Sequence, residues 1–96
     1  MITSKQRASL RKLANGIPAI LQIGKGGICD NLLKQIDDAL TARELVKITI
    51  LETAFLDTKE TANEIARILG AEPVQAIGFK FVLYRRSDDV KNPIEI

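Results

Sequence analysis

A short glycine-rich segment is the part of the sequence best suited to bind an anion. Three glycines and one lysine occupy four consecutive positions: Gly24, Lys25, Gly26 and Gly27. Glycines let the backbone approach a ligand closely, and the free amides of a following helix can accept an anionic oxygen. Lys25 adds a positive charge. We therefore expect this segment to bind phosphates of a nucleic acid; the alternative is a tight turn with no ligand.

Two nucleotide-binding motifs are excluded at this segment. A Walker loop requires Gly-Lys followed by Ser or Thr, and the sequence contains no such triplet. The dinucleotide fingerprint requires a small residue where Cys29 stands. A GxxG sequence between a strand and a helix instead resembles the loop with which KH domains hold a nucleic-acid backbone.

The positive charges are concentrated at the start of the chain. Five cations and no acid precede Asp30, whereas the rest of the chain has nine cations and twelve acids. The net charge of +2 is therefore the sum of +5 before residue 30 and −3 from residue 30 onward. Four of the early cations belong to the expected first helix: Lys5, Arg7, Arg11 and Lys12. We expect them and the glycine segment to form one RNA-binding surface; the alternative is a solvated helix face.

The residue types argue against an enzyme. The chain has no histidine and a single cysteine, Cys29. An internal disulfide, a Cys/His zinc site and the usual catalytic triads are therefore excluded, and we expect no catalytic residue, metal or cofactor. A thiol redox enzyme that uses Cys29 is a remote alternative, because no second cysteine could resolve an oxidised thiol.

Seven elements with the order α-β-α-β-α-β-β must position these residues. A capping box of Thr3 and Gln6 predicts a first helix that ends near Gly16. Apolar periodicity predicts strand 17–23, helix 30–42, strand 45–51, helix 58–69, and strands 73–77 and 79–84 joined by a hairpin at Gly78. We expect an α/β two-layer sandwich with one mixed four-stranded sheet, its first two strands parallel and its last two antiparallel.

A chain of 96 residues supports one core, so we expect a single domain at 1–86 followed by a loose tail at 87–96. Arg85 and Arg86 either extend the basic surface or form a solvated exit from the last strand.

Aromatic residues are few, and none precedes Phe55. We therefore expect contact with the RNA backbone rather than base stacking, and core packing for Phe79 and Phe81.

Four motifs follow one another in order along the chain: 23–27 (IGKGG), 45–47 (LVK), 74–78 (VQAIG) and 83–85 (LYR). Together they resemble the CRM domain, the chloroplast RNA splicing and ribosome maturation module, and the similarity is strongest to the stand-alone bacterial YhbY-type proteins. The resemblance implies a fold similar to the C-terminal domain of translation initiation factor 3. It also implies RNA binding, by Gly24–Gly27 and the first-helix cations, and a role with precursors of the large ribosomal subunit. Lys47 and Arg85 match by motif only.

The expected function is thus a non-enzymatic RNA-binding protein that assists assembly of the large ribosomal subunit. The start of the chain has no targeting segment and no apolar run could span a bilayer, so we expect a cytoplasmic monomer without membrane contact. The alternative is a protein-interaction module that docks on a ribosomal protein or assembly factor through its sheet face.

Overall fold

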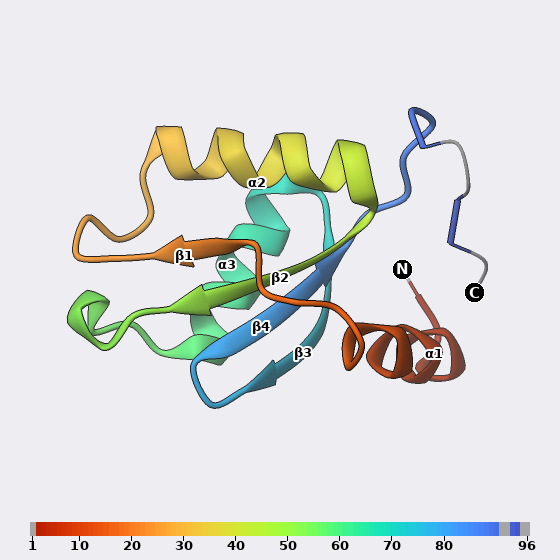
Figure 1. The fold of residues 1–96 in the computed structure, drawn as a ribbon, viewed down its shortest axis with the longest axis horizontal. Helices are drawn as coiled ribbons and strands as arrows, with labels where there is room; N and C mark the ends of the chain where they lie inside the picture. Colours follow the sequence, from red (N-terminus) through yellow and green to blue (C-terminus); the bar gives the residue numbers. More distant parts are fainter. Residues whose placement is uncertain (1, 91–92, 95–96) are drawn as a thin grey trace.

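A mixed four-stranded sheet organises the chain, and helices pack on it from both sides (Figure 1). The computed structural model describes residues 2–90 and 93–94. The elements are α1 (Ser4–Ala14), β1 (Leu21–Ile23), α2 (Asp30–Arg43), β2 (Leu45–Ile50), the 3-10 turn η1 (Glu52–Ala54), α3 (Thr58–Leu69), β3 (Glu72–Ile77) and β4 (Lys80–Tyr84).

The sheet has the strand order β1-β2-β4-β3. The first pair is parallel, with Leu21 opposite Ile48, and α2 makes the crossover between them. Strand β4 lies antiparallel to both β2 and β3. The predicted α/β class and mixed four-stranded sheet are confirmed, and β1 and β3 are the two edge strands.

Local signals in the sequence fix where two of the helices begin. The Thr3 side chain accepts a hydrogen bond from the Gln6 amide, and the Gln6 side chain accepts one from the Thr3 amide, which completes the predicted capping box. Asp57 caps α3 by accepting from the Glu60 amide. In the part of the chain that the structure describes, no helix is long and apolar enough to cross a membrane.

The main core lies between the sheet and helices α2 and α3. Strand β2 alternates, so that Val46, Ile48 and Ile50 point into this core at 0–1% exposure. Helix α2 contributes Leu32, Ile36 and Leu40 to the same cluster. These side chains are apolar and almost wholly removed from water, and each stabilises the fold by about 1.5–3 kcal/mol.

Helix α1 packs on the other face of the sheet and covers only part of it. Leu10 and Ala14 are fully buried there, against Val82 and Tyr84 of β4. The helix therefore adds a partial third layer to the two-layer body, at one end of the molecule (Figure 1). Among the described residues, no helix covers the rest of this face, toward β1.

The first strand is shorter than the sequence predicts. Strand pairing in the apolar run 17–23 begins only where the Ile20 amide donates to the Lys47 carbonyl, and β1 proper is Leu21–Ile23. Pro18 has no N–H to donate to a neighbouring strand. The residues before Ile20 therefore serve as the connection from α1 to the sheet.

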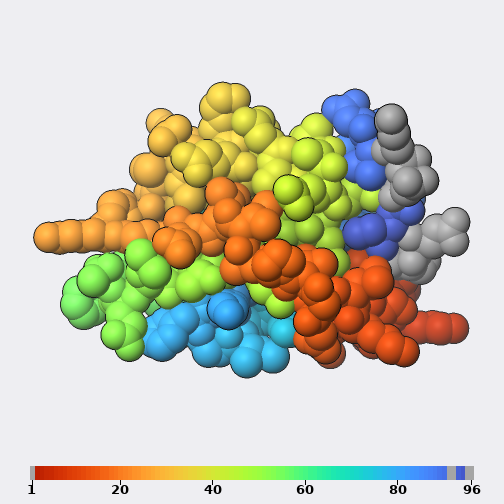
Figure 2. Space-filling model, in the orientation of Figure 1, coloured from red at the N-terminus to blue at the C-terminus, as the bar shows by residue number. Residues whose placement is uncertain are grey.

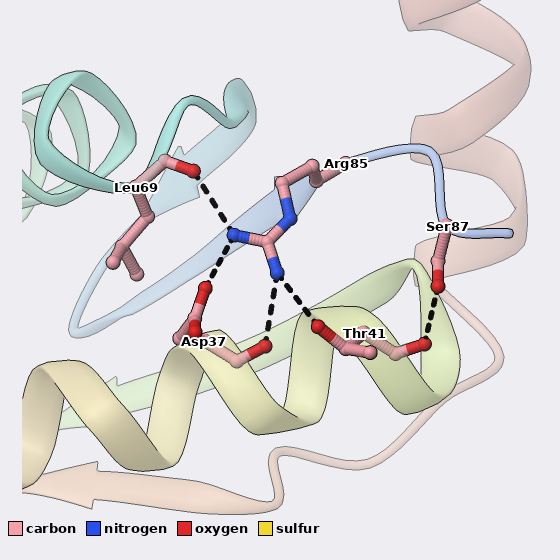
Figure 3. Close-up of polar contacts among 5 residues, drawn as sticks. All are labelled: Asp37, Thr41, Leu69, Arg85 and Ser87. Atoms are coloured by element: carbon pink, nitrogen blue, oxygen red, sulfur yellow. Dashed lines mark hydrogen bonds and ion pairs between the residues drawn. The ribbon is translucent and has the colours of Figure 1, made fainter. Parts of the chain in front are cut away.

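Arg85 is held against the body of the protein by its guanidinium group. Its Nη1 donates to Asp37 Oδ1 and the Leu69 carbonyl, and its Nη2 donates to the Asp37 carbonyl and Thr41 Oγ1, all within 2.6–3.0 Å (Figure 3). One guanidinium therefore joins the end of β4 to α2 and α3.

Glu44 holds the chain after residue 86. This residue follows α2 with a φ of 65° and is fully buried, and its carboxylate accepts hydrogen bonds from the Ser87 and Ile94 amides at 2.8 Å. Ile94 also packs beside the α1 cluster. Of the expected tail 87–96, residues 91–92 and 95–96 lie outside the described residues.

Candidate nucleic-acid interface

The glycine segment forms a one-turn loop between β1 and α2. The Gly27 amide donates to the Gly24 carbonyl at 2.9 Å, and Gly27 has a φ of 65°, a conformation that favours glycine. Lys25 and Gly26 lie at the exposed tip. Around the Cβ position of Gly26 no atom lies within 4 Å, so the backbone of this residue is open to a ligand.

A hollow of about 200 Å³ adjoins the loop on the side of α2. Besides the glycines and Cys29, polar side chains of Gln22, Asn31 and Gln35 line it. Cys29 precedes α2 and makes no capping hydrogen bond with its side chain. Asn31 and Gln35 lie one turn apart on α2, a spacing that could have signalled their shared face in the sequence.

One acid stands beside this hollow. Asp30 is exposed in the first turn of α2, where its negative charge opposes the attraction of the helix dipole for an incoming phosphate. The loop backbone and Lys25 are therefore the better phosphate ligands at this end.

Helix α1 and the glycine loop lie near opposite ends of the longest molecular axis (Figure 1). That axis extends 35 Å, against 24 and 22 Å for the other two. The five early cations therefore do not form one compact cluster. The loop and α1 can bind one RNA only if the RNA contacts extend along the molecule.

Two of the first-helix cations turn toward the edge strand β3. Arg7 Nε donates to the Pro73 carbonyl at 3.2 Å, and Arg11 Nε donates to the Val74 carbonyl at 3.3 Å. Arg7 also lies 4.0 Å from Glu72 in an ion pair. These bonds protect strand carbonyls that would otherwise be open to another chain. Within the described residues the Arg11 Nη groups have no partner, so they remain available to an anion.

A cleft of about 370 Å³ lies beside these arginines, between α1 and α3 along β3. Lys59 and Asn63 of α3 line it together with Arg7 and Arg11. The cleft thus brings together three cations from elements that are distant in the sequence. The other two first-helix cations, Lys5 and Lys12, are exposed to solvent.

The uncovered part of the sheet connects α1 with the glycine loop. Strands β1, β2 and β4 contain two charged residues, Lys47 and Lys80, and strand alternation directs both to this face because Val46, Ile48 and Phe81 point into the main core. The registers place Thr49 between Gln22 and Lys80. Figure 2 views this face, with the glycine loop at one end and α1 at the other.

The remaining motif residues have different roles. Arg85 is bound within the protein, and its side chain is 21% exposed. Cys29 is exposed and is the only cysteine of the chain. Lys47 is half-buried on the uncovered face. The pairing of strands that the sequence predicts does not show where this lysine lies relative to α1.

Three relatives match nearly the whole length of this chain, and one of them is a much longer protein. A protein from Bacillus subtilis named a probable RNA-binding protein, YqeI, is 41% identical over 95% of both chains. A protein from Haemophilus influenzae named an RNA-binding protein is 34% identical over 94% of this chain and 91% of that one. The rice chloroplast CRS2-associated factor 1 is 26% identical over 97% of this chain, which spans 13% of that protein.

A solved structure and a family model agree with this relationship. The solution structure of the hypothetical protein SAV1595 from Staphylococcus aureus superposes with a TM-score of 0.79, at 49% identity, over 92% of both chains. Residues 2–85 match the model of the CRS1/YhbY (CRM) domain. Since that match covers most of the chain, the protein belongs to the CRS1/YhbY (CRM) domain family.

Proposed function

We propose that this protein binds RNA, without catalysing a reaction, along the face that runs from the glycine loop across the uncovered sheet to α1. The observation that carries the proposal is the charge of this face: both charged residues of β1, β2 and β4 are lysines that point to it. Two relatives that are covered almost end to end are named RNA-binding proteins, which supports the same function.

The contacts are electrostatic and directed at the phosphates. Lys25 and the open backbone of Gly26 bind at one end, and Lys12 of α1 binds at the other. Lys47 and Lys80 lie between them. Because lysine and arginine neutralise phosphates whatever the base, affinity is high for RNA in general and sequence discrimination on this face is weak.

The RNA partner is ribosomal RNA in precursors of the large ribosomal subunit, and the protein assists their assembly as a cytoplasmic monomer. The support for this finer function is the resemblance to the stand-alone bacterial form of the domain. It is tested by sedimentation with precursor particles purified from bacteria. Co-sedimentation that is lost in Lys25→Glu supports it, whereas absence of co-sedimentation for the wild-type protein contradicts it.

A salt series tests RNA binding itself. The association constant for an RNA hairpin is measured at several salt concentrations for the wild type, Lys25→Ala and the control Lys34→Ala, which removes an exposed lysine paired with Asp38 on α2. Loss of one phosphate contact lowers the slope of log K against log salt by up to about 1 in Lys25→Ala only. Equal slopes in all three proteins would exclude Lys25 as a contact.

A protein partner is the second candidate function, and one observation favours it. An apolar groove of about 330 Å³ lies between the end of α1 and β2, lined mainly by Leu13, Ile17, Pro18, Ile20 and Leu45. Its place beside the uncovered sheet suits docking on a ribosomal protein or assembly factor. Binding to particles that survives nuclease treatment would favour this candidate over RNA.

A further inference from the structure

Exposed aromatic rings gather at the end of the molecule that carries the glycine loop. Of the four aromatic residues, Phe81 and Tyr84 are buried, whereas Phe55 is 93% exposed and Phe79 is 51% exposed. Ile77 is 66% exposed beside Phe79. The expectation that Phe79 packs in the core is therefore wrong, and the paucity of aromatic residues in the sequence conceals this local cluster.

Phe55 is exposed at a position that is also strained. It follows η1 in the left-handed region, with φ 52° and ψ 41°. A bulky side chain pays an energetic cost for this conformation, and such costs persist mostly where function requires them. Burial of the ring does not compensate, since almost all of it is in solvent. The position therefore presents an aromatic ring outward at the expense of stability.

Hydrogen bonds fix the two aromatic segments to each other and to the glycine loop. The Leu51 amide donates to the Ile23 carbonyl at 2.9 Å, and the Ile50 amide donates to the Phe79 carbonyl at 2.6 Å. Thr58 Oγ1 donates to the Gly78 carbonyl at 2.6 Å. The segments 24–27, 51–57 and 77–80 thus form one end of the molecule (Figures 1 and 2).

The charges around the rings favour a nucleic acid as the occupant. Lys25 lies at the tip of the adjoining loop, and Lys80, whose side chain points to the uncovered face of the sheet, follows Phe79 in the chain. Two acids lie on the same segment as Phe55: Asp57 is engaged in capping α3, and Glu52 of η1 is exposed. Rings flanked by cations suit a single strand, because the bases stack on the rings while the lysines bind the phosphates. Bases inside a duplex are already stacked and cannot reach the rings.

We propose that Phe55 and Phe79 form a platform on which unpaired bases of RNA stack while its backbone passes the Gly24–Gly27 loop. This inference rests on the proposed RNA binding. It adds a preference that the phosphate contacts do not supply: RNA with an unpaired segment binds more tightly than a fully paired duplex.

The test compares a short oligoadenylate with a fully paired RNA duplex. Phe55→Ala should lower the affinity for oligoadenylate by about 5- to 100-fold, the usual effect of removing one stacking ring, and leave duplex affinity unchanged. Phe55→Tyr keeps a ring and should bind like the wild type. Phe55→Leu, which is apolar without a ring face, should bind like Phe55→Ala.

Phe55→Gly separates function from stability. Glycine adopts the left-handed conformation without strain, so this variant should unfold at a higher urea concentration than the wild type and yet bind oligoadenylate more weakly. A tryptophan reporter gives a direct readout, because the chain contains no tryptophan. Fluorescence of Phe55→Trp should be quenched by oligoadenylate, whereas Ile68→Trp, on α3, should not respond.

The outcomes distinguish the two proposals. If wild-type protein binds neither RNA, the proposed function fails. If it binds both and Phe55→Ala and Phe55→Leu bind oligoadenylate as tightly as the wild type, the platform alone is overturned and the rings are left as a contact for a protein.

Discussion

Single residues of the glycine loop differ in what they contribute. Gly27 has a positive φ and closes the turn, whereas Gly26 has ordinary backbone geometry and open space around it. The sequence presents both simply as glycines. Their different backbone conformations make it possible to separate the folding of the loop from the approach of RNA.

Substitution of these two glycines by alanine tests that separation. Gly27→Ala should destabilise the protein by about 1 kcal/mol because alanine is strained at this φ. Gly26→Ala should leave the free energy of unfolding unchanged and weaken RNA binding, because the new Cβ occupies the approach to the backbone. Urea unfolding and RNA titration measure the two effects. Full RNA affinity in Gly26→Ala would contradict a close backbone contact.

Tyr84 makes stability depend on pH at the alkaline end. Burial raises the pKa of its phenol, the Glu44 carboxylate raises it further, and Arg86 opposes the shift. The folded protein therefore keeps the phenolic proton at pH values where the unfolded chain has lost it. Stability should be complete below the ordinary tyrosine pKa of about 10 and should fall as the pH rises through the pKa of the folded state.

The measurement uses the fact that Tyr84 is the only tyrosine. Absorbance of the tyrosinate ion should appear at higher pH in the folded protein than in the urea-unfolded protein. Between those two titrations the unfolding free energy of the wild type should decline more steeply than that of Tyr84→Phe. Coincident titrations of the folded and unfolded protein would refute the shift.

At the scale of elements, contacts between residues distant in the sequence decide which basic residues are available. Arg7 and Arg11 bond to carbonyls of β3, and Arg85 bonds to α2 and α3. Arg85 belongs to one of the four motifs that resemble the CRM domain, yet its guanidinium makes its hydrogen bonds to other residues of the same protein. A motif match therefore identifies a residue as important without stating whether it contacts the ligand.

Arg85→Ala should destabilise the protein by about 2–3 kcal/mol, because it leaves the Leu69 and Asp37 carbonyls without this donor and removes a charge-assisted bond to Asp37. The matched control is Arg86→Ala, an exposed neighbour, with an expected change below about 0.5 kcal/mol. Urea unfolding measures both. Equal stability of the two variants would show that the contacts of Arg85 contribute nothing net.

At the scale of the whole molecule, the separation of the glycine loop and α1 determines the length of RNA that can be bound. The long axis of 35 Å corresponds to about twelve base-pair steps of an A-form RNA duplex, which rises roughly 2.8 Å per step. A short RNA can therefore occupy one end at a time, and a longer one can occupy both.

This length dependence is testable with Lys25→Ala, Lys12→Ala and the double variant on RNA duplexes well below and well above about twelve base pairs. On the long duplex each single variant should lower affinity, and the two losses in binding free energy should add to within about 0.5 kcal/mol. On the short duplex each single variant leaves the other end able to bind, so only the double variant should lose most of its affinity. Identical behaviour on both duplexes would indicate that one end alone binds RNA.

The sequence by itself determined the elements and the fold class. The capping box at Thr3, the alternation of β2 and the turn at Gly78 depend on neighbours within a few residues, so local rules suffice to predict them. The early cations were equally visible, because charge is a property of the chain. The GxxG segment was correctly placed between a strand and a helix.

Only the tertiary structure decided how these parts combine. It placed α1 and the glycine loop at opposite ends, turned Arg7 and Arg11 to the β3 edge, and left Phe55 and Phe79 exposed to solvent. Which face a helix covers depends on packing between segments up to 66 residues apart in the chain, as for Arg7 and Pro73. Local sequence patterns carry no information about such distances, and for that reason they predicted the components of the surface and not its shape.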